Sequence, residues 1–160
     1  MNKVYLLIGG NMGDRLANIH TALTQVETHT GTIIKKSSIY ETEAWGLKEQ
    51  PSFYNLAIYI ETPLSAHALL LKLIEIEASM GRQRDIPLGP RTMDLDIIYF
   101  NKEVIQSEVI TIPHPRMHQR NFVLTPLVEI APNYKHPLLG LSNSQLLEVC
   151  EDKSLVYKKN

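Results

Sequence analysis

The sequence contains very little cysteine and no long apolar segment. Its 160 residues include one cysteine, Cys150, which excludes an internal disulfide and a zinc site built from several cysteines. No apolar run approaches the length of a transmembrane helix, and the run near the N-terminus is too short for a signal peptide. We therefore expect a cytoplasmic protein that does not insert into a membrane.

An excess of charge of one sign is also absent. The formal net charge is −1, so overall charge favours neither a nucleic-acid coat nor a role at a membrane surface. Charged residues make up 21% and hydrophobic residues 44% of the chain, which is ordinary for a globular domain with a sizeable core. We expect a single domain over residues 1–160 that is a monomer or homodimer and binds no nucleic acid.

The arginines are unevenly placed along this nearly neutral chain. Five of the six are Arg82, Arg84, Arg91, Arg116 and Arg120. The planar guanidinium group is better suited than a lysine ammonium to paired hydrogen bonds with phosphate oxygens. The clustering therefore indicates a local anion site.

The apolar pattern predicts strands and helices in alternation, without linkers or repeats. Core strands are expected over residues 4–8, 32–40, 53–61 and 95–100. Asp14 and Ser65 can act as N-caps for two helices with apolar stripes at helical spacing. Thr125 followed by Pro126 predicts the start of a third helix, and residues 142–145 resemble the capping box of a fourth.

This order of elements predicts an α+β fold. The β-α-β-β-α-β succession is the ferredoxin-like plan, an antiparallel sheet with helices packed against it. The two additional helices expected toward the C-terminal end can cover the other face of the sheet. The expected architecture therefore has three layers, α/β/α.

Two carboxylates stand close together on the last of the core strands. Asp94 and Asp96 are two residues apart, and side chains at this spacing in a strand point to the same side. Adjacent carboxylates repel each other unless a cation neutralises them, so the pair suggests one or two divalent metal ions. An isolated Asp-x-Asp triplet is more often a plain surface feature. Here the strand is apolar on its other side and Arg91 lies just upstream, which favours phosphate chemistry at a metal.

Residues 89–98, which contain this pair, resemble the signature of the 6-hydroxymethyl-7,8-dihydropterin pyrophosphokinase family of folate biosynthesis. Other segments resemble further motifs of that family, in the same order and along nearly the whole chain. They are residues 8–14, 37–42, 50–55, 113–116 and 120–124.

The resemblance implies transfer of pyrophosphate from ATP to the hydroxymethyl group of 6-hydroxymethyl-7,8-dihydropterin, with release of AMP. It implies two Mg²⁺ ions held by Asp94 and Asp96, one activating the pterin hydroxyl and the other stabilising the leaving oxygen. Mg²⁺ binds few protein carboxylates and completes its shell with phosphate and water, so two aspartates are enough. Positioning and electrostatics then dominate catalysis.

The resemblance also implies which residues form the two substrate sites. The residues expected near ATP are Glu77, Arg82, Arg84, Arg91, His114 and Arg120. Those expected to act in catalysis are Arg82, Arg91, Asp94 and Asp96. Those expected to line the pterin site are Thr42, Trp45, Phe53, Asn55 and Phe122.

A pterin offers flat apolar faces and an edge of donors and acceptors, which suits aromatic rings and a buried asparagine. Simpler roles remain open for some of these residues. Phe53 and Phe122 would also fit plain core packing, and Glu77 would also fit a partly exposed surface position.

The chain departs from the family pattern at several positions. Gly10 stands where the family usually has serine, Phe53 where it usually has tyrosine, and Glu43 where proline is common. The loop after Arg84 lacks an arginine and a tryptophan that many members have, and it is about one residue shorter. We expect these changes to affect loop closure and nucleotide affinity rather than the class of reaction.

Three other functions fit the sequence less well. A ferredoxin-like module that only binds a small ligand has no use for a carboxylate pair beside clustered arginines. An RNA-binding domain of similar topology would need a basic sheet face with exposed aromatic rings. Another metal-dependent nucleotide transferase would not need the residues assigned to the pterin.

Overall fold

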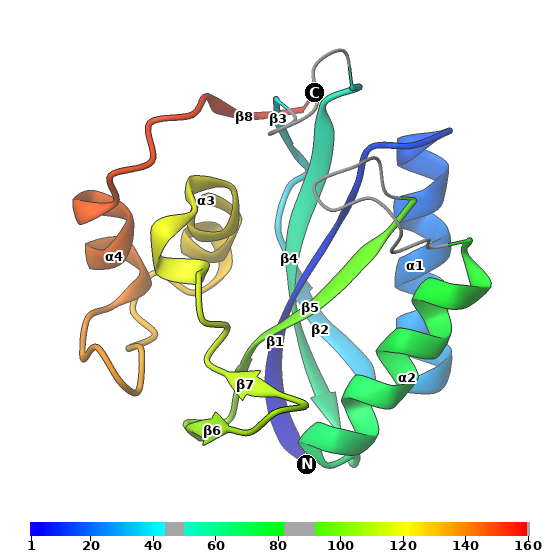
Figure 1. The fold of residues 1–160 in the computed structure, drawn as a ribbon, viewed down its shortest axis with the longest axis horizontal. Helices are drawn as coiled ribbons and strands as arrows, with labels where there is room; N and C mark the ends of the chain where they lie inside the picture. The colour runs from blue at the N-terminus through cyan, green and yellow to red at the C-terminus, as the bar shows by residue number, and fades with distance from the viewer. Residues whose placement is uncertain (44–49, 82–91, 160) are drawn as a thin grey trace.

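A six-stranded antiparallel sheet runs through the centre of the molecule (Figure 1). The computed structural model describes residues 1–43, 50–81 and 92–159. The order of strands is β5-β1-β4-β3-β8, and β2 also pairs with β4. The bounds are β1 (Asn2–Gly10), β2 (Thr32–Lys36), β3 (Tyr40–Thr42), β4 (Phe53–Thr62), β5 (Asp94–Phe100) and β8 (Val156–Lys158).

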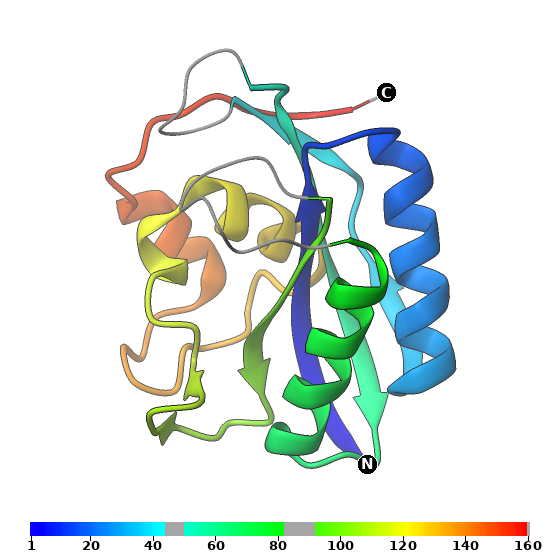
Figure 2. The ribbon, with the colours of Figure 1, turned by 45° about the vertical axis from the view of Figure 1, so that its right-hand side comes forward.

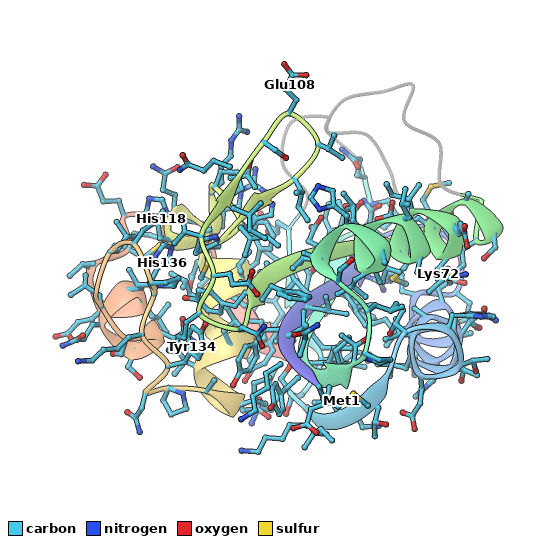
Figure 3. The ribbon with its side chains drawn as sticks, turned by 90° about the horizontal axis from the view of Figure 1, so that it is seen from below. Met1, Lys72, Glu108, His118, Tyr134 and His136 are labelled. Atoms are coloured by element: carbon cyan, nitrogen blue, oxygen red, sulfur yellow. The ribbon has the colours of Figure 1, made fainter. Side chains whose placement is uncertain are left out.

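Helices cover both faces of the sheet. Helices α1 (Arg15–His29) and α2 (Ala66–Ser79) lie along one face, as Figure 2 shows. Helices α3 (Asn121–Ile130) and α4 (Asn143–Val149) cover the other face (Figure 3). A small hairpin of β6 (Ile105–Gln106) and β7 (Thr111–Ile112), followed by the short 3₁₀ helix η1 (Met117–Gln119), links β5 to α3. The expectation of an α+β fold with an antiparallel sheet and four helices is confirmed.

The sheet separates two hydrophobic cores because strand side chains alternate between its faces. On β4, Leu56, Ile58 and Ile60 pack toward α1 and α2. The alternate residue Ala57 packs toward α3 and α4 with Leu7 of β1. Tyr134 and His136 lie on this second side as well (Figure 3). None of the helices in the described ranges has the length and apolar character needed to cross a membrane.

The helix starts predicted from local sequence are confirmed for three of the four helices. The Asp14 carboxylate accepts the Ala17 N–H at 3.0 Å, and the Ser65 hydroxyl accepts the Ala68 N–H at 3.2 Å. Residues 142–145 form the predicted capping box at the start of α4. Such caps typically stabilise a helix by about 1 kcal/mol each.

The prediction of a continuous strand over residues 32–40 is wrong. The structure has two strands, β2 and β3, joined by a break at residues 37–39. At the break the hydroxyl of Ser37 accepts the Ala57 N–H at 2.9 Å, so a side chain replaces a strand carbonyl. The backbone N–H of Ser38 donates instead to Glu129 of α3, also at 2.9 Å. The chain is thereby drawn toward α3 before β3 begins.

The prediction that the third helix starts at Thr125 and Pro126 is also wrong. Helix α3 begins at Asn121, and Pro126 lies inside it. The local residue Arg120 makes no side-chain capping bond. The carboxylate of Asp152 supplies a bond from outside the helix by accepting the Asn121 N–H at 3.0 Å. A cap that comes from 31 residues away leaves no signal in the local sequence.

Candidate active site

A pocket opens on the α3 side of the sheet, at the end where β1, β3, β4 and β5 lie beside the start of α3. It is lined by Leu7, Gly9, Thr42, Glu43, Phe53, Asn55, Asp94, Asp96, Arg120 and Phe122. Seven of these were predicted as site residues, so segments far apart in sequence meet as the resemblance implied.

The two aspartates lie at one end of β5 and face this pocket. Asp94 pairs with Gly9 of β1 and Asp96 pairs with Leu7, and all four residues line the pocket. Leu95 between them points to the opposite face, into the core beneath α2. The prediction that both carboxylates share one side of a strand is therefore confirmed.

Glu77 of α2 supports the same strand from behind. Its carboxylate accepts the backbone N–H of Leu95 at 2.8 Å. The side chain is 4% exposed, so the alternative of a partly exposed surface acid is wrong. Glu77 does not line the pocket. Its contact holds the peptide unit between the two aspartates, which fixes their direction on the other face.

Asn55 on β4 occupies space that only a glycine on β1 leaves open. A Cβ atom at Gly9 would lie 1.8 Å from the Asn55 side-chain oxygen and 2.9 Å from the Tyr54 carbonyl oxygen. The Asn55 amide is 5% exposed and lies in the pocket lining. Gly9 therefore lets the amide lie across the neighbouring strand, close to the position of Asp94.

Thr42 of β3 brings a buried hydroxyl to the pocket. Thr42 pairs with Phe53 of β4, and its side chain is 2% exposed. Within the described part of the chain, its Oγ1 atom is buried without a hydrogen-bond partner. A buried hydroxyl without a partner costs about 1–3 kcal/mol. A ligand with a polar edge in this pocket would remove that cost.

Arg120 and Phe122 reach the pocket from the start of α3. The guanidinium carbon of Arg120 lies 5.7 Å from the centroid of the Phe122 ring. A positive charge and an aromatic face are thus presented side by side. This pair suits a ligand that has both an anionic group and a flat ring.

His114 lies close to Arg120 but does not line the pocket. Its ring Nδ1 accepts the Arg116 N–H at 3.3 Å, so the neutral ring carries its proton on Nε2. Burial, together with the charges of Arg120 and Arg116, lowers the pKa of His114 to about 4. The histidine is therefore neutral at pH 7 and has an N–H donor in positively charged surroundings, where an anion would be favoured.

Four predicted site residues, Trp45, Arg82, Arg84 and Arg91, lie outside the residues that the structure describes. Three residues that line the pocket were not predicted as site residues, namely Leu7, Gly9 and Glu43. The first core strand was expected over residues 4–8, whereas β1 runs from Asn2 to Gly10 and so includes Gly9. The alternation of β1 places Leu7 and Gly9 on one face, and this is the signal that would have identified them.

The carboxylate pair fits Mg²⁺ better than zinc. In the described ranges there is no group of three or more His, Cys, Asp or Glu side chains that could hold a metal ion. A structural zinc site would need four protein ligands and a catalytic one three. Mg²⁺ takes one or two carboxylates together with substrate phosphates and water, and Asp94 and Asp96 supply that set.

Comparison with known proteins identifies a family. The family described as 7,8-dihydro-6-hydroxymethylpterin-pyrophosphokinase (HPPK) matches residues 5–132. A 2-amino-4-hydroxy-6-hydroxymethyldihydropteridine pyrophosphokinase of Bacillus subtilis is 45% identical over 130 residues, which are 81% of this chain and 78% of that protein. The protein of the same name from Aquifex aeolicus is 39% identical over 138 residues, with 86% of both chains covered.

Some relatives are much longer than this chain. The folic acid synthesis protein fol1 of Pneumocystis carinii is 38% identical over 95% of the chain, which spans 20% of that protein. A crystal structure of Plasmodium falciparum HPPK-DHPS superposes with a TM-score of 0.75 over 92% of this chain and 43% of that one. Sequence identity there is 20%, so this likeness concerns the fold.

Proposed function

The chain belongs to the 6-hydroxymethyl-7,8-dihydropterin pyrophosphokinase family of folate synthesis, and from this premise we propose how its residues carry out the reaction. The family reaction, which we assign to this chain, is pyrophosphoryl transfer from ATP to hydroxymethyldihydropterin. The observation that carries the assignment is one pocket holding a carboxylate pair at one end and the buried polar groups of Thr42 and Asn55 at the other.

The pterin binds at the Thr42 and Asn55 end of the pocket. The buried amide of Asn55 and the buried hydroxyl of Thr42 suit the donors and acceptors of the pyrimidinone edge. The Thr42 hydroxyl has no hydrogen-bond partner among the described residues. Phe53 and Phe122 line the same pocket and offer aromatic rings on which the pterin rings can pack. Trp45 completes this set by family resemblance.

ATP binds at the carboxylate end. Asp94 and Asp96 would hold Mg²⁺, which would neutralise charge on the phosphates of ATP. Arg120 borders the pocket, and His114 lies near it with a donor N–H. Arg82, Arg84 and Arg91 join this anion site by family resemblance, and Arg82 and Arg91 act on the transferred group. Glu77 contributes through its hold on β5.

The residues of the chain act mainly by positioning. The pterin hydroxyl loses its proton to solvent as its oxygen forms a bond to the β-phosphorus, and the bond from that phosphorus to the oxygen of AMP breaks. Asn55 and Thr42 fix the pterin edge so that the hydroxymethyl group faces the aspartate end. Arg120 stabilises negative charge on the phosphates as the bond breaks. Loss of one such electrostatic group typically lowers kcat about 100- to 1,000-fold.

The test is product identity. The purified protein, given ATP, Mg²⁺ and the reduced hydroxymethylpterin, should form AMP and the pterin diphosphate in equal amounts. Chromatographic separation of AMP from ADP decides the result. ADP as the product would contradict pyrophosphoryl transfer, and absence of pterin-dependent nucleotide consumption would contradict the pterin assignment.

We also propose finer assignments of fold and location. The strand order β5-β1-β4-β2, with α1 and α2 on one face, supports a ferredoxin-like core with α3 and α4 added as a third layer. The single cysteine, buried and unpaired, supports a cytoplasmic protein. We propose a monomer or homodimer with ATP and the pterin as its ligands.

A further inference from the structure

The last residues of the chain connect two elements that line the pocket. Residues 150–159, which we call the C-terminal strap, leave the end of α4, pass the start of α3 and continue as β8 beside β3 (Figure 1). The strap lies beyond residues 5–132, the part of the chain that the family matches.

At α3 the strap supplies the contacts that the helix start lacks locally. Asp152 accepts the backbone N–H of Asn121, the first residue of α3, at 3.0 Å. The Asn121 side-chain amide donates in turn to the Ser154 carbonyl at 2.8 Å. The Asp152 carboxylate also accepts two hydrogen bonds from Ser154, one from its backbone N–H at 2.9 Å and one from its side-chain hydroxyl at 2.6 Å. The start of α3 is therefore tied to the strap by two hydrogen bonds, both donated by Asn121.

At its other end the strap is part of the sheet. Val156 pairs with Thr42 of β3, and Tyr157 pairs with Glu41. The Lys159 N–H donates to the Ile39 carbonyl at 2.8 Å, which extends the pairing past β8. Only three residues separate Asp152 from Val156, so movement at one attachment is transmitted to the other.

Both attachments are next to pocket residues. Asn121 lies between Arg120 and Phe122, and both of these line the pocket. The other attachment is at Thr42 itself. We propose that the C-terminal strap sets the spacing between Phe122 and Thr42, with Asp152 as a positioning residue for pterin binding that acts through the first turn of α3. The inference rests on the proposed function, because it places the pterin between these two residues.

The charge of Asp152 agrees with this role. Burial raises its pKa, but hydrogen bonds from Ser154 and from the Asn121 N–H, with the charge of Lys153, outweigh burial and lower the pKa below its ordinary value. The carboxylate is therefore ionised at neutral pH. A negative charge at a helix N-terminus is stabilised by the helix dipole.

The test measures pterin affinity directly. Fluorescence titration of the reduced pterin, with Mg²⁺ and a non-hydrolysable ATP analogue, gives Kd for the full-length protein and its variants. Asp152→Ala should raise Kd about tenfold, which corresponds to about 1.4 kcal/mol. Asp152→Asn keeps an acceptor without the charge and should raise Kd less. In the assay, the KM for the pterin should rise while kcat stays within about twofold.

The matched control is Glu151→Ala. Glu151 is an exposed carboxylate next to Asp152 in the same strap, so its removal should leave the pterin Kd within about twofold of wild type. Circular dichroism at the assay temperature shows which variants are folded. If Asp152→Ala unfolds, Asp152→Asn and Ser154→Ala test the inference in its place. Each keeps part of the contact between the strap and Asn121, so each should weaken pterin binding partially.

Two results would overturn the inference. One is a folded Asp152→Ala or Asp152→Asn that binds the pterin as tightly as wild type. The other is an equal loss of affinity in Glu151→Ala, which would indicate a general effect of charge. A wild-type protein that binds no pterin would instead contradict the proposed function itself, so the two failures are distinguishable.

Discussion

The carboxylate of Glu77 accepts the backbone N–H of Leu95, the residue between Asp94 and Asp96, at 2.8 Å. Glu77, on one face of the sheet, thus fixes β5, which carries Asp94 and Asp96 on the other face. The Leu95 peptide is buried, so its N–H has no access to water as a substitute partner. The functional pair depends on a residue that does not itself line the pocket.

This contact predicts a combined loss of stability and activity in Glu77→Ala. A buried N–H left without its acceptor should lower the free energy of unfolding by about 1–3 kcal/mol. The apparent Mg²⁺ requirement should rise, since the aspartates lose their fixed direction. Urea unfolding and Mg²⁺ titration of the rate measure the two effects. Glu75→Ala, which removes a largely exposed carboxylate from the same helix, should change neither.

Removal of either pocket aspartate should abolish turnover without unfolding the protein. Asp94→Ala and Asp96→Ala each remove half of the proposed Mg²⁺ site, so kcat should fall by at least about 100-fold. Both variants should remain folded, which circular dichroism at the assay temperature checks. Full activity in either variant would contradict the metal role. EDTA should stop the wild-type reaction, and added Mg²⁺ should restore it.

Thr42→Val should separate binding from stability. The hydroxyl is buried without a partner in the described structure, so valine of similar shape should leave the free energy of unfolding unchanged or raise it. Pterin affinity should fall about tenfold, as expected for one lost hydrogen bond. Thermal melts and pterin titration measure the two quantities.

Thr62→Val is the matched control for this prediction. Thr62 is fully buried, and its hydroxyl donates to the Thr30 carbonyl. This substitution should destabilise the protein by about 1–3 kcal/mol and leave pterin affinity nearly unchanged. If Thr42→Val were as destabilising as Thr62→Val, its hydroxyl would have a structural partner and not one in the ligand.

Gly9→Ala should be strongly unfavourable, chiefly because of the Asn55 side chain and also because of the Tyr54 backbone carbonyl. The new Cβ would overlap the Asn55 amide, which must move and lose its place in the pocket. We expect lower stability and a pterin Kd raised at least about tenfold. The double variant Gly9→Ala/Asn55→Ala should recover part of the stability but none of the binding. Additive stability losses would contradict a direct clash between the two positions.

The low pKa of His114 predicts a pH effect on stability. Its folded-state pKa is about 4, well below the ordinary value of about 6.5. As the pH falls, His114 takes up a proton in the unfolded chain before it does so in the folded protein. The stability associated with neutral His114 is therefore fully present above pH 6.5 and is lost as the pH falls toward 4. Urea unfolding at pH 7 and pH 5 should show a smaller loss in His114→Asn than in wild type. If His114→Asn lost as much stability between pH 7 and pH 5 as wild type does, a group other than His114 would be responsible for the pH effect.

Local periodicity was enough to predict much of the fold and part of the site. The two-residue repeat of a strand placed Asp94 and Asp96 on one side, and the same repeat placed Phe53 and Asn55 on one face of β4. The caps of α1, α2 and α4 involve residues three positions apart, so they are readable in a short window. The function came from family resemblance, because spacing alone indicates a metal but not a pterin.

The features that the sequence did not predict depend on contacts between distant segments. The start of α3 is set by Asp152, and the break between β2 and β3 by Ser37 and Glu129. Gly9 belongs to the site because of Asn55, which is 46 positions away but adjacent across the sheet. None of these partners is visible until the chain is folded.

The strap has a further consequence, for association between copies of the protein. Strand β3 lies between β4 and β8, so β8 covers backbone N–H and C=O groups that would otherwise form an open sheet edge. Uncovered edges pair readily with strands of other molecules. A substitution that detaches β8 would therefore expose β3 as a template for aggregation as well as loosening the pocket. The same three residue pairs that hold Thr42 beside β8 therefore also cover the edge of β3.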